Sequence, residues 1–372
     1  MLQMRKLLPL SLAISLLLST ACRKEIEKIV VVQEVDKQYS WSTDKASFYG
    51  NFSILLGSGK GPGGLYFQQP GGFAALTGTP TSQLSLTQYL FGGSTDITIR
   101  NPIGRDFFVT YYDSLVHVVP NTHPVMSGAG CFIRLKKLDP QALRVQPNRF
   151  TFNKLAAISA NNYVLIPYET TRKDFKNRLV LARITAASSP YYPVYAAQTQ
   201  LIELPITSGI YPYMPTLLMA FDDYFLVDCG SEGVYKITES GLARQVMPAY
   251  TGVNTFFRSK GVLYATLDGQ RLAVSTTNGD TWQITPGGPS MLFTTIHPVG
   301  DSLVGVSHAL GGSLFTFNLD MAKQRWRIRP LQDDGLNHAA INGLETWNDT
   351  VYLATSSGLY KRPLSKFFES KP

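Results

Sequence analysis

The sequence is poor in cysteine, histidine and charged residues. It contains 3 cysteines and 5 histidines among 372 residues, and only 16% of its residues are charged. The histidines occur singly, without the HxH or HExxH spacing of a zinc site. The basic excess is modest and scattered, apart from small clusters such as Arg325-Arg327-Arg329, and we interpret it as a solvated surface, since an exported protein rarely meets nucleic acid. We therefore predict no metal, no cofactor and no nucleic-acid partner.

The chain also lacks convincing amphipathic helical patterns from residue 45 onward. Its apolar residues fall instead in short runs of β-branched and aromatic types, separated by turns rich in Gly, Asn, Asp and Ser. The low charge and an aromatic content of 12% exclude a disordered chain. These features predict an all-β protein with many short strands and tight turns.

A repeated hairpin pattern is clearest in the C-terminal half. Paired apolar runs occur at 224–237, 262–275, 303–317 and 351–361, which gives a period of roughly 40 to 50 residues, typical of β-propeller blades. We predict a propeller of about six to seven four-stranded blades over residues 45–372. A pair of β-sandwich domains is the alternative. The glycine-rich segment at 57–64 lacks the spacing of a phosphate-binding loop, and we expect a flexible loop there.

One hairpin turn resembles the Asp-box of sialidases and related propellers. The turn reads Ser275-Thr276-Thr277-Asn278-Gly279-Asp280-Thr281-Trp282 and departs from the motif by having Thr277 in place of the aspartate. In those families the motif is a folding element between the outer strands of a blade, so the resemblance implies no catalysis. It implies structural roles for five residues: Ser275, Thr277, Gly279, Thr281 and Trp282.

The N-terminus holds the longest apolar run. Arg5 and Lys6 precede an apolar stretch at 7–18, and Ser19-Thr20-Ala21-Cys22 follows. This layout is typical of a secretory signal peptide and is too short for a lasting membrane span. The ending resembles the lipobox of bacterial lipoproteins, although Ser19 stands where that family prefers leucine. An ordinary signal peptide is the alternative.

The lipobox resemblance implies a membrane anchor. Residues 1–21 would be the signal peptide, Cys22 would carry the lipid, including palmitate, and residues 22–44 would be the lipidated N-terminus and a tether. The expected location is the outer membrane, with the domain facing either the cell surface or the periplasm. The remaining cysteines, Cys131 and Cys229, are too far apart in sequence to predict whether they pair.

The sequence offers a weak candidate for a binding surface in two loops dense in Tyr and Pro. Such loops supply rigid, amphipathic contact area for a glycan or a protein. No catalytic constellation is evident, so we predict a non-enzymatic binding protein. The alternatives are a sialidase-like glycoside hydrolase, with Arg, Tyr and acidic side chains converging in the central channel, and an assembly or scaffold factor for a membrane complex. The loop residues are Tyr191, Tyr192, Tyr195, Tyr211 and Tyr213.

Overall fold

The computed structural model describes most of the chain beyond the N-terminal segment. The chain divides into two units, residues 1–39 and 40–372, and every described residue belongs to the second unit. The described ranges are 40–43, 54–61, 63–69, 72–77, 85–90, 104–121, 130–146, 156–174, 176–187, 194–204, 215–286, 295–307, 312–320, 325–336 and 339–370.

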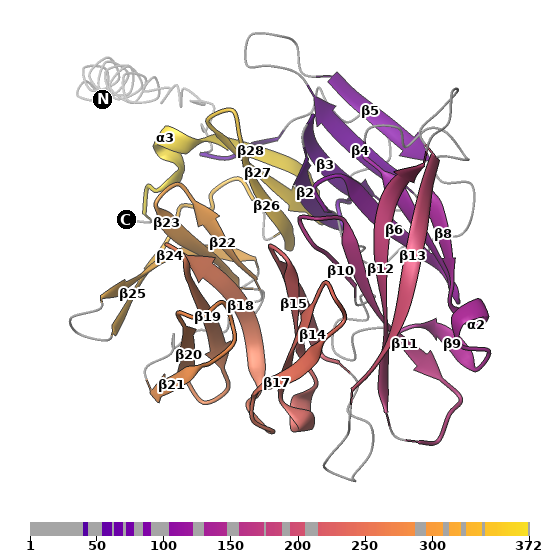
Figure 1. Ribbon diagram of the computed structural model, residues 1–372. Helices are drawn as coiled ribbons and strands as arrows, with labels where there is room; N and C mark the ends of the chain where they lie inside the picture. The colour runs from indigo at the N-terminus through magenta and orange to yellow at the C-terminus, as the bar shows by residue number, and fades with distance from the viewer. Residues whose placement is uncertain are drawn as a thin grey trace, which may run out of the picture. The chain divides into compact units, whose positions relative to one another are not determined.

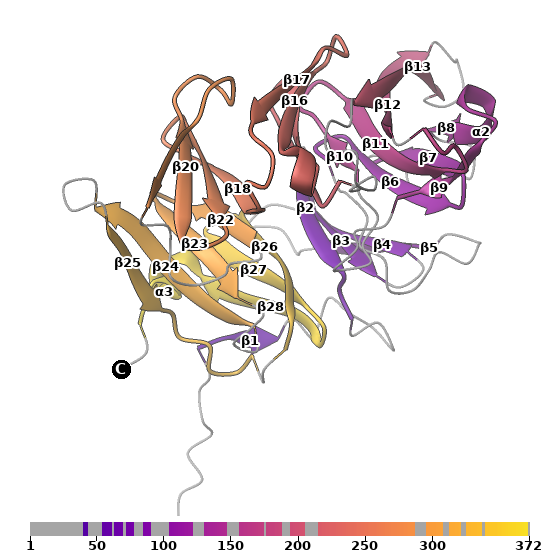
Figure 2. The ribbon, with the colours of Figure 1, turned by 90° about the horizontal axis from the view of Figure 1, so that it is seen from below.

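Residues 40–372 form a seven-bladed β-propeller, which confirms the predicted fold class and blade count (Figures 1 and 2). Each blade is an antiparallel sheet whose strands follow one another along the chain, except that blade 7 takes its outer strand from the N-terminal end of the domain. The first strand of a blade lies innermost, as contacts between the first strands of blades 1 and 7, 3 and 4, 4 and 5, and 5 and 6 indicate. Propeller closure leaves only short strand edges exposed, which suits a chain built from short strands.

Blade 1 has four strands in chain order, whereas blades 2 and 3 depart from this pattern. Blade 2 has three strands within the described residues, while blade 3 has an additional short strand paired with its second. Blade 1 contains β2 (Gly57–Gly61), β3 (Gly64–Gln69), β4 (Gly72–Thr77) and β5 (Ser85–Leu90); blade 2 contains β6 (Phe107–Tyr112), β7 (Leu115–Pro120) and β8 (Cys131–Arg134), followed by helix α2 (Leu135–Leu138); blade 3 contains β10 (Ala157–Ile158), β11 (Tyr163–Thr170), β12 (Asn177–Ala187) and β13 (Val194–Leu204), with β9 (Ala142–Val145) beside β11.

The last four blades carry the repeats seen in the sequence, and each predicted hairpin forms the second and third strands of its blade. Blade 4 contains β14 (Leu217–Phe221), β15 (Tyr224–Asp228), β16 (Val234–Thr238) and β17 (Ala243–Met247), with the 3-10 turn η1 (Gly230–Glu232); blade 5 contains β18 (Val253–Ser259), β19 (Val262–Leu267), β20 (Arg271–Ser275) and β21 (Gln283–Pro286); blade 6 contains β22 (Thr295–Val299), β23 (Ser302–Ser307), β24 (Ser313–Asp320) and β25 (Arg325–Pro330); blade 7 contains β26 (Ile341–Trp347), β27 (Thr350–Thr355) and β28 (Gly358–Pro363), followed by helix α3 (Leu364–Phe367).

Both faces of each blade are covered by its neighbours, and β15 shows how the sequence accommodates this. Its side chains alternate between two hydrophobic clusters: Phe225 and Val227 pack with residues of blade 3, while Tyr224 and Leu226 pack with residues of blade 5. Successive side chains on a strand point to opposite faces of the sheet. A strand with neighbours on both faces is therefore a continuous apolar run and not an alternating one.

The N-terminal strand β1 (Ser42–Thr43) closes the ring as the outer strand of blade 7. Ser42 pairs with Lys361 and Thr43 pairs with Tyr360 of β28. Trp41 is 2% exposed, donates its indole N–H to the Gln332 carbonyl at 2.9 Å, and meets the Phe367 ring edge-on at 5.9 Å. Residues 41–43, which are assigned to the tether from the sequence, are therefore part of the propeller.

The prediction of a flexible loop at the glycine-rich segment is wrong. The segment forms the innermost strand of blade 1 and the hairpin that follows it. The physical reason is the close packing of this strand against segments of the neighbouring blades. A Cβ atom at Gly61 would lie 2.6 Å from the Arg105 carbonyl oxygen, and one at Gly343 of β26 would overlap Ser58 of β2. Glycine is the residue that permits such close backbone approach. Composition alone does not distinguish this use of glycine from flexibility.

Blades 2 and 3 share a single hydrophobic cluster. It joins side chains of β6, β7 and β8 to those of β11 and β12. The fourth strand of blade 3, β13, also reaches blade 2: it contacts β8, and Val194 forms a parallel bridge with Gly130. These two blades are therefore joined more extensively than by inner-strand contacts alone.

Candidate functional site

Most of the residues that the sequence singles out for binding or anchoring lie outside the described residues. These are Cys22 and four of the five loop tyrosines. Tyr195 is described and is half-buried on β13, where its ring meets Phe107 edge-on at 5.0 Å. Burial and the nearby Asp106 carboxylate raise the pKa of Tyr195. This tyrosine packs against the core that blades 2 and 3 share.

The Asp-box-like residues form the turn between β20 and β21, the third and fourth strands of blade 5. The Ser275 hydroxyl accepts the Gly279 N–H at 2.9 Å, and the Thr277 hydroxyl accepts the Thr281 N–H at 2.9 Å. Trp282 donates its indole N–H to the Gly279 carbonyl at 3.0 Å. Gly279 has φ +81°, which favours glycine. Thr277 therefore receives the backbone hydrogen bond with a hydroxyl instead of a carboxylate.

This turn also docks blade 5 onto blade 4. Asp280 of the turn accepts hydrogen bonds from Lys236 at 2.8 Å and from Arg244 at 2.6 Å. Lys236 additionally lies 4.3 Å from the centre of the Tyr224 ring, and the pKa of Asp280 is lowered by its hydrogen bond from Lys236 and by the two cations. The turn is therefore part of an interface between blades.

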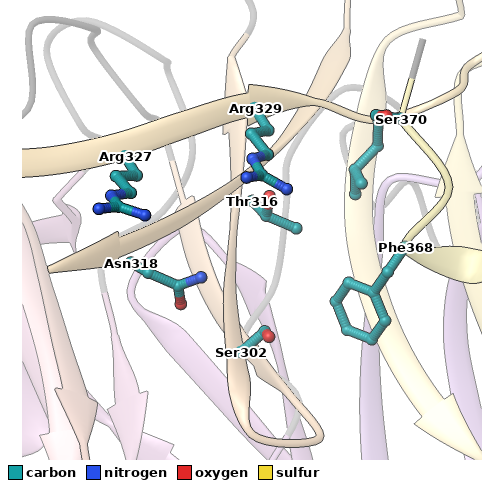
Figure 3. Close-up of a pocket in the computed structure, with 8 residues that line it drawn as sticks. Ser302, Thr316, Asn318, Arg327, Arg329, Phe368 and Ser370 are labelled. Atoms are coloured by element: carbon teal, nitrogen blue, oxygen red, sulfur yellow. The ribbon is translucent and has the colours of Figure 1, made fainter. Parts of the chain in front are cut away.

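A pocket of about 500 Å³ lies on the side of blade 6 that faces blade 7 (Figure 3). Arg327 and Arg329 extend from β25 toward β24, which contributes Thr316 and Asn318. The register explains this arrangement, since Thr316 pairs with Arg329 and Asn318 pairs with Arg327. The other lining residues are Ser302, Leu331, Phe368 and Ser370.

The alternation of β25 produces this lining. The sequence Arg-Trp-Arg-Ile-Arg places Trp326 and Ile328 on one face, where they pack with a hydrophobic cluster shared with blade 5. Arg327 and Arg329 lie on the other face, which turns toward blade 7. Further in, this face becomes apolar, with Val304 and Leu331 in the core that blades 6 and 7 share. The sequence shows the arginine spacing but not the pocket, because the C-terminal segment that completes the pocket is distant in sequence.

The C-terminal segment is held beside this pocket by a buried arginine. Arg362 is fully buried, donates to the Gln332 side chain at 3.2 Å and pairs with Glu369 at 2.5 Å. Its guanidinium also lies 5.9 Å from the centre of the Trp41 ring. Leu331 forms an isolated bridge with Ser370. The ring-closing contacts and one wall of the pocket therefore share the same short segment.

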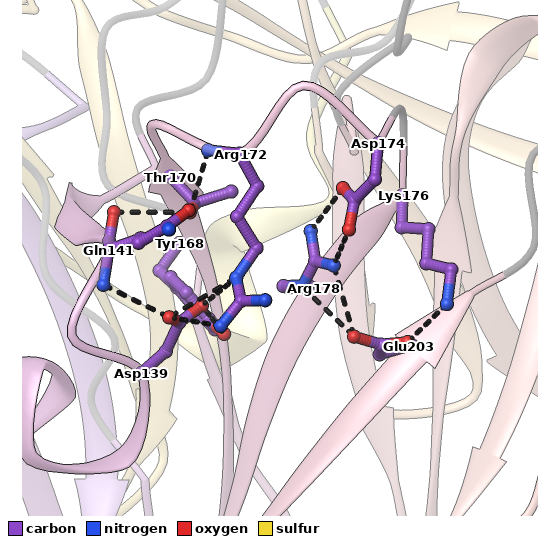
Figure 4. Close-up of polar contacts among 9 residues, drawn as sticks. All are labelled: Asp139, Gln141, Tyr168, Thr170, Arg172, Asp174, Lys176, Arg178 and Glu203. Atoms are coloured by element: carbon purple, nitrogen blue, oxygen red, sulfur yellow. Dashed lines mark hydrogen bonds and ion pairs between the residues drawn. The ribbon is translucent and has the colours of Figure 1, made fainter.

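A group of charged side chains in and beside blade 3 forms ion pairs and hydrogen bonds with one another (Figure 4). Arg178 is buried and pairs with both Asp174 and Glu203, and Lys176 also contacts Glu203 at 2.6 Å. Asp139, on the same figure, accepts hydrogen bonds from Tyr168 and Arg172, at 3.0 and 2.9 Å. Burial alone would raise the pKa of Asp139, and these hydrogen bonds hold it below its ordinary value. Because these charged side chains pair with one another, we assign them a role in stabilising blade 3 and not in binding a ligand.

Two other acidic residues, Asp228 and Glu345, have raised pKa values, in contrast to Asp139. Burial raises the pKa of Asp228 to about 6, although the carboxylate accepts a hydrogen bond from Thr216 at 2.6 Å. On the inner strand of blade 7, burial raises the pKa of Glu345 to about 7, opposed by the Ser58 hydroxyl at 3.3 Å and the Lys60 charge. Each carboxyl lies where strands meet, which is the reason for its desolvation.

The residue types of the hydrolase alternative meet at the end of blade 4, where Arg258 contacts Asp222 and the Tyr224 hydroxyl. Tyr224 is 2% exposed, and burial raises its pKa. A tyrosine nucleophile needs access to substrate and an activated hydroxyl, and this residue has neither. The contacts instead stabilise the boundary between blades 4 and 5.

The remaining cysteines do not pair. Cys131 and Cys229 are both free and buried. Across the described residues, no group of three or more His, Cys, Asp or Glu side chains is placed to hold a metal ion. The same part of the chain contains no helix that is long and apolar enough to cross a membrane.

Comparison with known proteins shows the fold and no family. No family model matches the sequence, and no curated protein matches it. Among solved structures, the WD40 repeats of RRP9 give a TM-score of 0.50 at 8% identity, over 88% of this chain and 99% of that one. BamB from Moraxella catarrhalis gives 0.46 at 12%, over 87% and 96%. PorZ, a surface component of the type-IX secretion system of Porphyromonas gingivalis, gives 0.45 at 12%, over 90% of this chain and 39% of PorZ.

Proposed function

We propose that this chain is a lipid-anchored binding protein of the bacterial outer membrane, whose propeller holds a partner outside the cytoplasm. The leader that ends at Cys22 carries the proposal, because its charged, apolar and small-residue regions follow the order of a lipoprotein signal. A lipid on Cys22 would anchor a folded domain through a short linker, since the propeller begins at Trp41–Thr43, only a short way along the chain from that cysteine.

The length of the tether limits where the propeller can act. The chain between Cys22 and Ser40 spans at most about 60 Å when fully extended. A propeller anchored through Cys22 would therefore stay close to one membrane, where a partner is met as a neighbour and not by free diffusion. Such confinement raises the effective concentration of a membrane-associated partner. This favours a binding role over turnover of a soluble substrate.

The anchoring is tested by metabolic labelling with an alkyne analogue of palmitate, followed by membrane fractionation. We expect the wild-type protein to incorporate the label and to sediment with outer membranes. Cys22→Ser should abolish labelling, whereas the matched control Cys131→Ser should leave it unchanged. Label retained by Cys22→Ser, or wild-type protein without label, would contradict the proposal. Protease treatment of intact cells then distinguishes the cell surface from the periplasm.

A further inference from the structure

The charged residues that line the pocket on the blade 7 side of blade 6 are all basic. Two of its eight lining residues are arginines and none is acidic. Both guanidinium groups lie on the same side of β25 (Figure 3). A guanidinium matches the planar geometry of a carboxylate, to which it donates two parallel hydrogen bonds, and a second guanidinium nearby adds positive charge. The pocket is therefore suited to an anion.

The remaining lining indicates more than a simple anion. Ser302, Thr316 and Ser370 offer hydroxyl groups, and Asn318 offers an amide that both donates and accepts. Phe368 is an exposed aromatic side chain, 39% accessible, on the wall opposite the arginines (Figure 3). The phenylalanine ring, which has no hydrogen-bonding group, is suited to pack against the apolar face of a sugar ring. Inorganic phosphate would leave most of this lining unused.

The size of the pocket agrees with a ligand larger than an ion. Its volume of about 500 Å³ falls within the ordinary range for small-molecule sites. The apolar floor at Leu331 is limited, and most of the lining is polar. A lipid tail or a hydrophobic peptide side chain would therefore find little complementary surface here. One or two sugar units with a carboxylate match the charge, the hydroxyl-binding groups and the aromatic wall together.

We propose that this pocket binds an acidic carbohydrate, with the carboxylate of a uronic acid at Arg327 and Arg329 and a sugar face against Phe368. The inference rests on the proposed function, because an exported binding protein meets the acidic polysaccharides of a cell envelope. It names the ligand class that the proposed function leaves open. The pocket is a binding site, with no reaction assigned to it.

The test is calorimetric titration of the purified full chain with digalacturonic acid, using galactobiose as the neutral counterpart. We expect digalacturonate to bind at least tenfold more tightly than galactobiose. Arg327→Gln and Arg329→Gln should each weaken the binding about tenfold, as expected for the loss of a charge-assisted hydrogen bond. Phe368→Ala should weaken the binding of both sugars. Arg105→Gln, which removes an exposed arginine side chain remote in sequence from this pocket, serves as the matched control and should change nothing.

Two other probes distinguish the alternative anions on the wild-type protein, without any variant. Inorganic phosphate and vesicles of phosphatidylglycerol are titrated alone and as competitors of digalacturonate. If either binds more tightly than the sugar, the pocket is a phosphate or lipid-headgroup site and the proposal is wrong. Absence of digalacturonate binding, equal binding of galactobiose, or unchanged binding by both arginine variants would also overturn it. Each of these results leaves the palmitate-labelling result, and hence the anchoring, unaffected.

Discussion

Replacement of Trp41 should open the propeller ring, because this residue lies at the point where the N-terminal strand joins the last blade. Its side chain is 2% exposed and contacts three parts of the closure: the Gln332 carbonyl, the Phe367 ring and the Arg362 guanidinium. Strand β1 contributes only two paired residues of its own. The indole therefore supplies much of the contact that keeps β1 in place.

The expected magnitude follows from these contacts. Truncation of a buried tryptophan to alanine costs about 3 to 5 kcal/mol through lost burial and the cavity left behind. Trp41→Phe keeps an aromatic ring against Phe367 but loses the hydrogen bond to Gln332, which is worth about 1 kcal/mol. We therefore expect the free energy of unfolding to fall in the order wild type, Trp41→Phe, Trp41→Ala.

Urea unfolding followed by far-ultraviolet circular dichroism measures this order without relying on tryptophan fluorescence. Leu242→Ala is the matched control, because Leu242 is 67% exposed and its truncation should change stability by less than about 0.5 kcal/mol. A Trp41→Ala protein that unfolds within 1 kcal/mol of the wild type would refute the role of this residue in ring closure. Equal losses for Trp41→Phe and Trp41→Ala would instead assign the effect to the hydrogen bond.

Three further predictions concern single side chains. Because burial raises the pKa of Asp228 to about 6, the native state binds its proton more tightly than the unfolded state, and the contribution of this carboxyl group to stability should fall by about 2 to 3 kcal/mol as the pH rises from about 4 to above 6. Asp228→Asn should lack this loss, and parallel pH profiles of the two proteins would contradict the reasoning. Thr277→Ala should lower the melting temperature by removing about 1 kcal/mol, whereas Thr277→Asp should preserve or raise it by accepting the same Thr281 N–H; a larger loss with aspartate than with alanine would refute this. In the Cys22→Ser background, Cys131 and Cys229 should react with a thiol reagent only after unfolding, since burial raises the pKa of both thiols, and rapid labelling of the native protein would show that they are accessible.

Several elements could be predicted from the sequence because their determinants are local. The hairpins that became the paired central strands of blades 4 to 7 are visible as apolar runs around polar turns. The turn at 275–282 is equally local, since its hydrogen bonds connect residues at most four positions apart. Residues 57–64 show where local interpretation failed: Gly61 lies against the Arg105 carbonyl and Ser58 lies against Gly343, and both partners are distant in the chain.

The candidate pocket could be predicted only in part. The alternating arginines of β25 are evident in the sequence, and their spacing places them on one face of a strand. The polar partners on β24 depend on strand register, while Phe368 and Ser370 come from the C-terminal segment, which the Arg362–Glu369 pair and the bridge between Leu331 and Ser370 hold in place. Side chains brought together from distant segments leave no signal in a single sequence.

The sequence by itself determined the all-β class and the repeating blade unit, because both depend on contiguous stretches of residue types. The anchor at Cys22 also depends on such a stretch and stays a prediction. The tertiary structure decided the count of seven blades, the closure of the ring through Trp41 and β1, and the convergence of β24, β25 and the C-terminal segment on one pocket. The reason is that a blade cannot cover its own two faces. Its neighbours must, and the identity of those neighbours depends on the closure of the whole ring.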